Sequence, residues 1–227
     1  MQNITLSELV KRHPLATTFL NEHHIDYCCG GDDLLYHAIE KAGYNQSSIL
    51  SDLDEFLKEQ EAKFNPSISG KLYQMSVSEL ISHLEATHHR DERMLLTDID
   101  AKLATILSVH YTSHKEELVT VFKLFADLRK ELLVHFVQEE EEVFPLMREE
   151  ATAVSLAKVE ALEADHEAAG VLIKALVKAT HDFTAPKDSC PTYEATYALL
   201  KRLVEDVFLH IYKENSILFP LYEKGVA

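Results

Sequence analysis

The chain has 227 residues, of which 46% are hydrophobic and 26% charged, as in an ordinary globular protein with one large or two modest domains. Acidic residues outnumber basic ones by 38 to 22, so nucleic acid and anionic membranes, which bind positive surfaces, are poor partners. The chain opens without an apolar leader, and no stretch reaches the length of a membrane span, so we expect a cytoplasmic protein. Three cysteines, two of them adjacent, argue against a disulfide framework.

Residues 1–62 are expected to form a small helical domain. Thr5 and Glu8 have the spacing of a capping box, which predicts the start of a short helix. Further helices are expected over about residues 34–42 and 47–61. Because a unit of this size buries little core of its own, we expect it to dock on a neighbouring domain or on a second copy of itself.

Two adjacent cysteines, Cys28 and Cys29, lie within this unit and are followed by Gly30 and Gly31. Glycine adopts positive φ angles without a steric penalty, so the pattern predicts a turn that leaves both sulfurs near the surface. The alternative is that both are small buried side chains within the turn. The third cysteine, Cys190, lies alone in a proline-flanked loop, and we assign it no role.

Residues 63–75 are expected to be a linker, because Pro66 and Gly70 lie there among polar side chains. After the linker, Ser76 and Glu79 repeat the capping-box spacing and predict the start of a long helix. The predicted domain boundary therefore falls between the small N-terminal domain and everything that follows this linker.

The long helix after residue 76 carries a single apolar stripe. Its members are Ile81, Leu84, Leu95, Ile99 and Ile106. His88 falls within the stripe at helical spacing from Leu84, whereas His89 is turned away by about 100°. We therefore predict that His88 points into the interior, with His89 as the rival if the helix is rotated.

A histidine and a glutamate four residues apart occur twice, as His135 with Glu139 and as His210 with Glu214. In both copies Phe-Pro-Leu begins five residues after the glutamate. Residues i and i+4 lie on one face of a helix, so each pair aims an imidazole and a carboxylate at one point. Both faces are apolar, and buried ionisable groups are costly without a partner, so a metal ion is the expected partner. A surface ion pair is the alternative for one copy alone.

Three further helices are expected over about residues 113–148, 152–180 and 192–224, and His166 interrupts an apolar stripe on the second of them. The predicted fold is all-α, with an up-down four-helix bundle over residues 76–227. Six inward side chains would then meet at one level: His88, His135, Glu139, His166, His210 and Glu214. Imidazole and carboxylate ligands without cysteine suit iron or manganese better than copper or zinc, and we favour two bridged iron ions.

The Ile25-Asp-Tyr-Cys-Cys-Gly-Gly31 motif and the bundle together resemble the iron-sulfur cluster repair di-iron (RIC) proteins, and the resemblance covers nearly the whole chain. It implies a hemerythrin-like bundle with two oxo- or hydroxo-bridged, non-haem iron ions on the six side chains above. Glu139 and Glu214 would be the bridging, catalytic carboxylates. The resemblance also implies a cytoplasmic stress-response protein, a homodimer, whose partners are iron-sulfur proteins damaged by nitric oxide or peroxide.

We expect the reduced centre to donate iron to a damaged cluster, with Cys28 and Cys29 receiving that iron in transit or binding nitric oxide as soft thiolate ligands. An enzymatic alternative is the reduction of nitric oxide to nitrous oxide at the di-iron centre. A third alternative is a module that senses or stores oxygen or nitric oxide.

Four other ionisable residues of the predicted bundle are considered as parts of the centre. His110 resembles a histidine sometimes counted as a seventh ligand in this family, but 22 residues of helix, roughly 33 Å, separate it from His88. We therefore leave His110 outside the centre and assign it a role in a turn or at a second site. Glu140 and Glu141 are expected to be solvated, whereas Glu142 is a candidate for orienting a ligand histidine.

Overall fold

The computed structural model describes residues 1–61 and 69–224. The all-α prediction is confirmed: within these residues no β-strand forms, and only an isolated bridge pairs Thr5 with Leu34. None of the described helices combines the length and the apolarity that crossing a lipid bilayer requires.

The chain divides into two units by its internal contacts. One unit contains Met1–Leu80 and the C-terminal stretch that begins at Phe208, and the other contains Ile81–Val207. Within the predicted linker, residues 62–68 lie outside the described residues, so the domain boundary at 63–75 stays a prediction.

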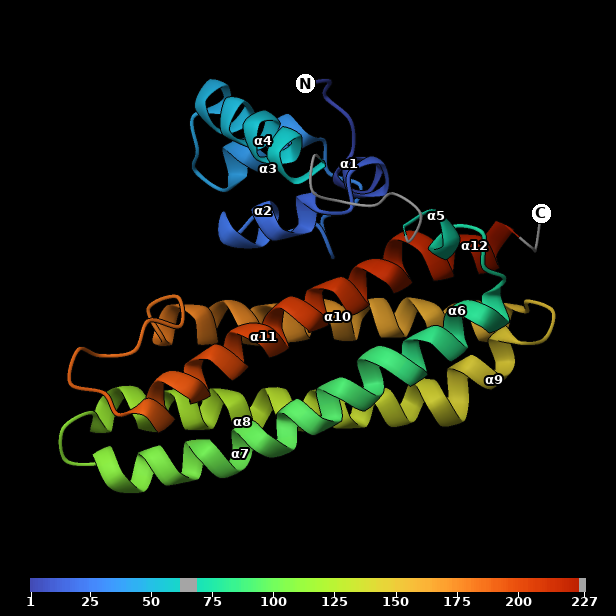
Figure 1. The fold of residues 1–227 in the computed structure, drawn as a ribbon. Coiled ribbons are helices and arrows are strands. Elements are labelled where there is room, and N and C mark those ends of the chain that lie inside the picture. Colours follow the sequence, from blue (N-terminus) through green and yellow to red (C-terminus); the bar gives the residue numbers. More distant parts are fainter. Residues whose placement is uncertain (62–68, 225–227) are drawn as a thin grey trace. The chain divides into compact units, whose positions relative to one another are not determined.

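The unit Ile81–Val207 is built from long helices that run side by side (Figure 1). They are α7 (Arg90–His110), α8 (Lys115–Gln138), α10 (Ala153–Ala179) and the first part of α11 (Pro191–Lys213). Helix α8 contacts both α7 and α10. The apolar faces of these helices form a buried core that includes Leu96, Ile99, Leu103, Val121, Phe125, Leu128, Leu132, Val159, Leu162, Ile173, Leu200 and Leu203. Burial of these apolar stripes is what makes the four helices pack as a bundle.

Local contacts and backbone angles determine where α10 begins and ends. Thr152 and Ser155 cap the start of α10 by bonding each other's backbone amides, at 3.1 and 2.9 Å. The same helix ends before His181, Asp182 and Phe183, which take left-handed φ angles of 49°, 57° and 56°. Left-handed residues cannot continue a right-handed helix, so the chain turns there toward α11.

A π-helical turn interrupts the first predicted helix of the bundle, although its apolar stripe is buried as predicted. The capping box at Ser76 and Glu79 forms, with the Ser76 amide donating to the Glu79 carboxylate at 2.8 Å. Helix α6 (Val77–Leu84) then passes through the π turn η1 (Glu85–His89) into α7. The sequence predicted one uninterrupted helix, whereas the structure has a π turn with one extra residue, and this turn includes both histidines.

Two further π turns coincide with the repeated sequence motif. They are η2 (Glu139–Val143), followed by α9 (Phe144–Met147), and η3 (Glu214–Leu218), followed by α12 (Phe219–Lys224). In each, the phenylalanine amide donates to the carbonyl of the glutamate five residues earlier. The following proline has no amide hydrogen and disfavours the ordinary α-helical ladder. The spacing of glutamate and Phe-Pro-Leu is therefore the sequence signature of the π turn.

The unit that contains the N-terminus is a set of short helices. They are α1 (Leu6–Arg12), α2 (Ala16–Glu22), α3 (Leu35–Lys41), α4 (Gln46–Glu61) and α5 (Ser69–Leu72), joined by the C-terminal end of the chain. Only half of the predicted first capping box forms. The Glu8 amide donates to Thr5 at 3.2 Å, but the Glu8 carboxylate accepts from Arg12 at 2.7 Å instead of reaching back.

The N-terminal segment contacts the C-terminal helical segment within this unit. The Tyr212 hydroxyl lies 3.0 Å from that of Tyr73 and donates to the Ser7 carbonyl at 3.3 Å. Asn215 donates to the Cys28 carbonyl at 3.3 Å. The small N-terminal segment therefore gains buried contacts from the other end of the same chain.

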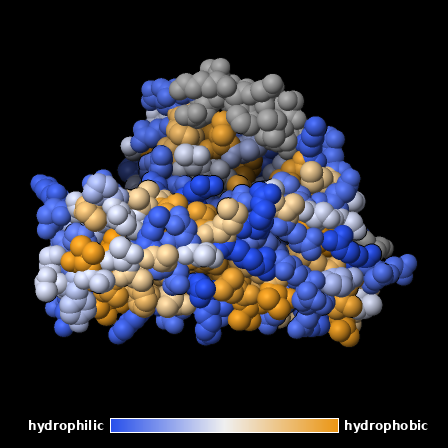
Figure 2. Space-filling view, turned by 60° about the horizontal axis from the view of Figure 1, so that its bottom comes forward, coloured by the Kyte–Doolittle hydropathy of each residue, from blue (hydrophilic) through white to orange (hydrophobic). Residues whose placement is uncertain are grey.

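The surface in Figure 2 is mainly hydrophilic, with hydrophobic residues in separate patches. Among the described large apolar side chains, Met94, Val109 and Val171 are each about two-thirds exposed. Scattered apolar side chains of this kind are normal on protein surfaces and need no partner.

Candidate metal centre

Imidazoles and a carboxylate converge inside the unit Ile81–Val207. The carboxylate of Glu139, at the start of η2, lies 3.3 Å from His89 Nε2 and 3.3 Å from His135 Nε2, through different oxygens. His166 Nε2, from α10, lies 3.0 Å from His135 Nε2. His135, His166 and His89 are at most 7% exposed, and Glu139 is fully buried.

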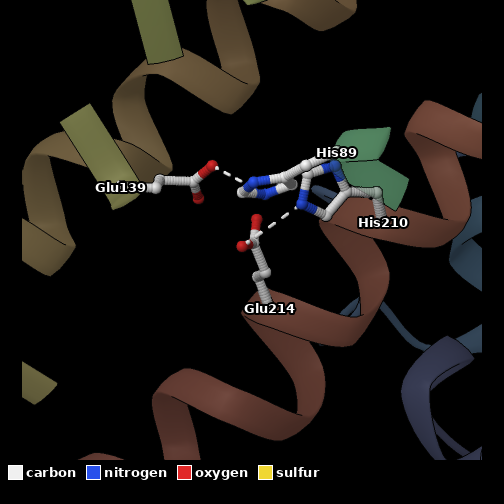
Figure 3. A group of neighbouring side chains, drawn as sticks. All are labelled: His89, Glu139, His210 and Glu214. Atoms are coloured by element: carbon white, nitrogen blue, oxygen red, sulfur yellow. Dashed lines mark ion pairs between the residues drawn. The ribbon is translucent and has the colours of Figure 1, made fainter. Parts of the chain in front are cut away.

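The second repeated pair has the same local geometry. His210 Nε2 lies 3.4 Å from Glu214 Oε1, and both side chains are buried. The candidate ligands form two groups, and within each group the ligand atoms lie within 4.8 Å of one another. The first group contains His89 and His210, and the second contains His135 and His166. Glu139 and Glu214 belong to both groups. Figure 3 shows the first group, whose two imidazoles and two carboxylates point toward one another.

The donor set fits a pair of metal ions. Two ligand atoms on one ion at about 2.1 Å lie roughly 3.0–3.4 Å apart, which matches the 3.3 and 3.4 Å separations here. The Glu139 carboxylate is fully buried, and each of its oxygens lies 3.3 Å from the nitrogen of a different imidazole. An ion on each side of Glu139 would satisfy both oxygens, since its two oxygens face different histidines.

The structure places His89, and not His88, with the other five predicted residues. Both histidines are buried, but His88 Nδ1 lies 2.9 Å from Asp206 and takes part in a different group. The physical reason is η1: a π turn needs five residues where an α-helix needs four, so the interior position after Leu84 is His89. The rival position noted for a rotated helix is therefore the observed one.

Two family profiles match the chain. The profile described as the hemerythrin HHE cation binding domain matches residues 80–222, which hold all the residues of the centre. The chain belongs to the hemerythrin HHE cation binding domain family. A second profile, ScdA_N, described as a domain of unknown function (DUF542), matches residues 2–57, which hold the adjacent cysteines.

Curated relatives match the chain along nearly its full length. The iron-sulfur cluster repair protein YtfE of Enterobacter sp. (strain 638) is 28% identical over 215 residues, covering 95% of this chain and 94% of the relative. A probable iron-sulfur cluster repair protein of Haemophilus influenzae is 28% identical over 218 residues, with the same coverage. YtfE of Escherichia coli O81 (strain ED1a) is 27% identical over 215 residues, covering 95% and 94%. The family resemblance drawn from the motifs is confirmed.

A carboxylate outside the predicted set orients His89 in the hemerythrin domain. His89 Nδ1 lies 2.7 Å from Glu140 Oε1, and Arg93 donates to both Glu140 oxygens at 2.8 and 2.9 Å. Burial raises the pKa of Glu140, but the hydrogen bonds from Arg93 and His89 outweigh it and leave that pKa below its ordinary value. A carboxylate on Nδ1 leaves Nε2 to face Glu139, where a metal ion would bind.

Aromatic rings fix the same imidazole. Phe136 and Phe144 stack on His89, with ring centroids 4.9 and 5.8 Å away. Glu140 was expected to be solvated and instead holds the histidine, whereas Glu142, the candidate for that role, pairs with Lys158 at 2.6 Å on the surface. No local pattern indicates this role for Glu140, because its partner Arg93 lies 47 residues away in the chain.

Glu140→Gln is expected to weaken metal binding at the His89 position. The amide keeps the size of the side chain but loses the charge that holds the Nδ1 proton, and such outer partners typically contribute about 10–100-fold in metal affinity. Competition with a chelator measures the affinity. Glu141→Gln, an exposed neighbour, is the control, and equal affinity in the two variants would contradict the assigned role.

The adjacent cysteines differ in exposure. Cys28 is buried and Cys29 exposed, so the expectation that both sulfurs lie near the surface holds for Cys29 alone. The two sulfurs lie 3.8 Å apart, and Cys28 donates to Asp26 at 3.2 Å. The hydrogen bond with Cys29, together with burial, raises the pKa of Cys28 well above its ordinary value. Asp26, Cys28 and Cys29 nevertheless have ligand atoms close enough for one metal ion.

His110 and Cys190 meet away from the centre of the hemerythrin domain. His110 Nε2, at the end of α7, lies 3.3 Å from Cys190 Sγ, which directly precedes α11. The hydrogen bond from His110 and those from the first backbone amides of α11 hold the pKa of Cys190 at about 7. His110 is therefore outside the centre, as expected, but Cys190 has a partner that the sequence did not suggest.

Alkylation of Cys190 is expected to rise with pH to half its maximal rate near pH 7, because the thiolate is the reactive form. His110→Asn should move this midpoint upward, since the principal donor to the sulfur is lost. Mass spectrometry of the Cys190 peptide after timed iodoacetamide treatment measures the rate. His114→Asn, which removes a contact to Asp188 at 3.2 Å, serves as the control and should leave the midpoint in place.

Proposed function

We propose that this chain is a di-iron protein that restores iron-sulfur clusters damaged by nitric oxide or peroxide, by donating iron from its His/Glu centre. The observation that carries the proposal is the pair of ligand groups sharing Glu139 and Glu214. The full-length similarity to proteins named for iron-sulfur cluster repair supports the assignment. Damaged iron-sulfur proteins are therefore the proposed partners.

In this proposal His89 and His210 would hold one iron ion and His135 and His166 the other, and Glu139 and Glu214 would serve both groups. Bound ferrous iron supplies the ion that a damaged cluster lacks. Four of the six ligands are neutral imidazoles, so the protein neutralises less of the positive charge than an all-carboxylate site would. Weaker neutralisation by the ligands makes an ion easier to release to sulfur ligands elsewhere.

Cys28 and Cys29 are the proposed receiving ligands for iron in transit, with nitric oxide as a second small ligand. Because its pKa is raised, Cys28 holds its proton until a cation displaces it. Asp26 Oδ1, 3.2 Å from the Cys28 sulfur, is placed to accept that proton. Asn215 follows Glu214 in the chain and bonds the Cys28 carbonyl, which supports a functional link between the cysteine turn and the C-terminal ligand pair.

The test is repair of a nitric oxide-damaged iron-sulfur dehydratase by the full chain loaded with isotopically labelled ferrous iron. We expect dehydratase activity to return and the label to appear in its cluster, and Cys28→Ser/Cys29→Ser to slow the transfer. Unlabelled clusters, or no recovery, would contradict iron donation. Nitrous oxide formed from nitric oxide and a reductant, without iron transfer, would favour the enzymatic alternative.

The proposal also includes a cytoplasmic location and a homodimer. Light scattering of the purified chain measures the mass directly and distinguishes the dimer from the monomer of 25.8 kDa. A monomer across the micromolar range would remove the dimer from the proposal and leave the iron chemistry unaffected.

A further inference from the structure

A second set of possible metal ligands lies in the unit Ile81–Val207, apart from the centre described above. It consists of His88 on η1, Glu92 on the first turn of α7 and Asp206 on α11, with ligand atoms within 4.8 Å of one another. None of the three belongs to either group that shares Glu139 and Glu214. The π turn creates this arrangement, because it turns His89 toward Glu139 and leaves His88 facing α11.

The separations suit one ion. His88 Nδ1 lies 2.9 Å from Asp206 Oδ2 and 3.8 Å from Glu92 Oε1. Ligand atoms at about 2.1 Å from an ion are roughly 3.0 Å apart at right angles and roughly 4.2 Å apart when opposite each other, so both distances fall close to this range. The three ligand atoms therefore lie close enough together to share one cation.

Burial and charge favour a divalent ion. Glu92 is fully buried and His88 is 3% exposed, while the Asp206 side chain keeps 30% of its surface open. Two carboxylates and a neutral imidazole carry a charge of −2, which a divalent cation cancels in a buried place. One nitrogen and two oxygens suit ferrous iron, manganese or zinc better than magnesium or calcium, which prefer oxygen alone.

We propose that His88, Glu92 and Asp206 bind a third divalent transition-metal ion. Three protein ligands leave coordination positions for water, so this ion is held more weakly than ions at the six-ligand centre. The partly exposed Asp206 gives the ion a route to solvent. The site is therefore an outer position that an arriving or departing iron ion can occupy, and its existence does not depend on the repair function.

The test uses the full chain with its main centre filled by two equivalents of ferrous iron under anaerobic conditions. Manganese(II) is then titrated, and electron paramagnetic resonance measures the free ion. We expect the wild-type protein to bind about one further equivalent, and Asp206→Asn and Glu92→Gln to bind it at least tenfold more weakly with the iron content unchanged. Asp127→Asn, an exposed acid on α8, is the matched control.

Two outcomes overturn the site: no manganese bound beyond the iron, or wild-type affinity in Asp206→Asn. Asp206 is partly exposed, so this variant decides the question even where Glu92→Gln does not fold. The optical spectrum of the iron pair is recorded in the same samples. Loss of the third ion with an unchanged iron spectrum therefore tests the His88, Glu92 and Asp206 site alone. The proposed repair function is tested separately, by the dehydratase assay described above.

Discussion

Glu139→Gln is expected to abolish binding of both metal ions of the proposed di-iron centre. Glu139 belongs to both ligand groups, and its two oxygens face His89 and His135 separately, at 3.3 Å each. An amide offers one neutral oxygen and a nitrogen that cannot bind a cation, so each ion loses a charged ligand. We expect iron to fall from two ions per chain to well below one, measured by elemental analysis after reconstitution.

Thermal unfolding separates loss of metal from loss of fold in this variant. Without metal, Glu139→Gln should be at least as stable as the wild type, because the substitution removes a fully buried carboxylate. With iron at a hundredfold excess over the dissociation constant, the wild type should gain about 2.7 kcal/mol and the variant almost nothing. Glu141→Gln, which is exposed, controls for the acidic run and should keep both ions. A variant that retains two ions would remove the bridging role of Glu139.

The bundle and the two His/Glu pairs were predictable because their signals are local. Apolar stripes fix which face of a helix is buried, and a four-residue spacing puts His135 with Glu139 and His210 with Glu214 whatever the rest of the fold does. The level at which the helices meet follows from where these pairs interrupt the stripes. Sequence reasoning is most secure where one helix alone decides the geometry.

The choice between His88 and His89 was not predictable, because it depends on one extra residue in a helical turn. In η2 and η3 two sequence features indicate the π turn: a proline follows the phenylalanine, and the phenylalanine lies five residues after the glutamate. The turn η1 (Glu85–His89) contains no proline and has no such mark. A uniform helical period therefore gave the wrong register at that histidine.

The remaining surprises are contacts between residues that are distant in sequence. Glu140 accepts hydrogen bonds from Arg93, which is 47 residues away in the sequence, and His110 contacts Cys190, which is 80 residues away. Periodicity reports whether a side chain faces a core but not which residue of another helix it meets. Partners of this kind need the register between helices, which only the folded structure supplies.

His89→Ala and His88→Ala are expected to behave differently although the two residues are adjacent. His89 Nε2 lies 3.3 Å from Glu139 in one group of the main centre, so its loss should release the ion of that group first. Loss of a direct ligand should exceed the roughly 100-fold effect typical of outer partners. We expect no more than one iron per chain and a changed spectrum of the iron pair. His88→Ala should keep both irons and their spectrum, and lose only the third ion.

The pair of variants tests the π turn itself as well as the ligands. Both histidines are buried, so each variant loses packing, and circular dichroism with thermal unfolding measures that loss for each of them. A difference in iron content then reports which imidazole faces Glu139. If His88→Ala lost the iron pair and His89→Ala kept it, the helix would follow an unbroken α period through this turn. In that case η1 would be absent, and the third-ion site, which requires His88 to face α11, would be absent with it.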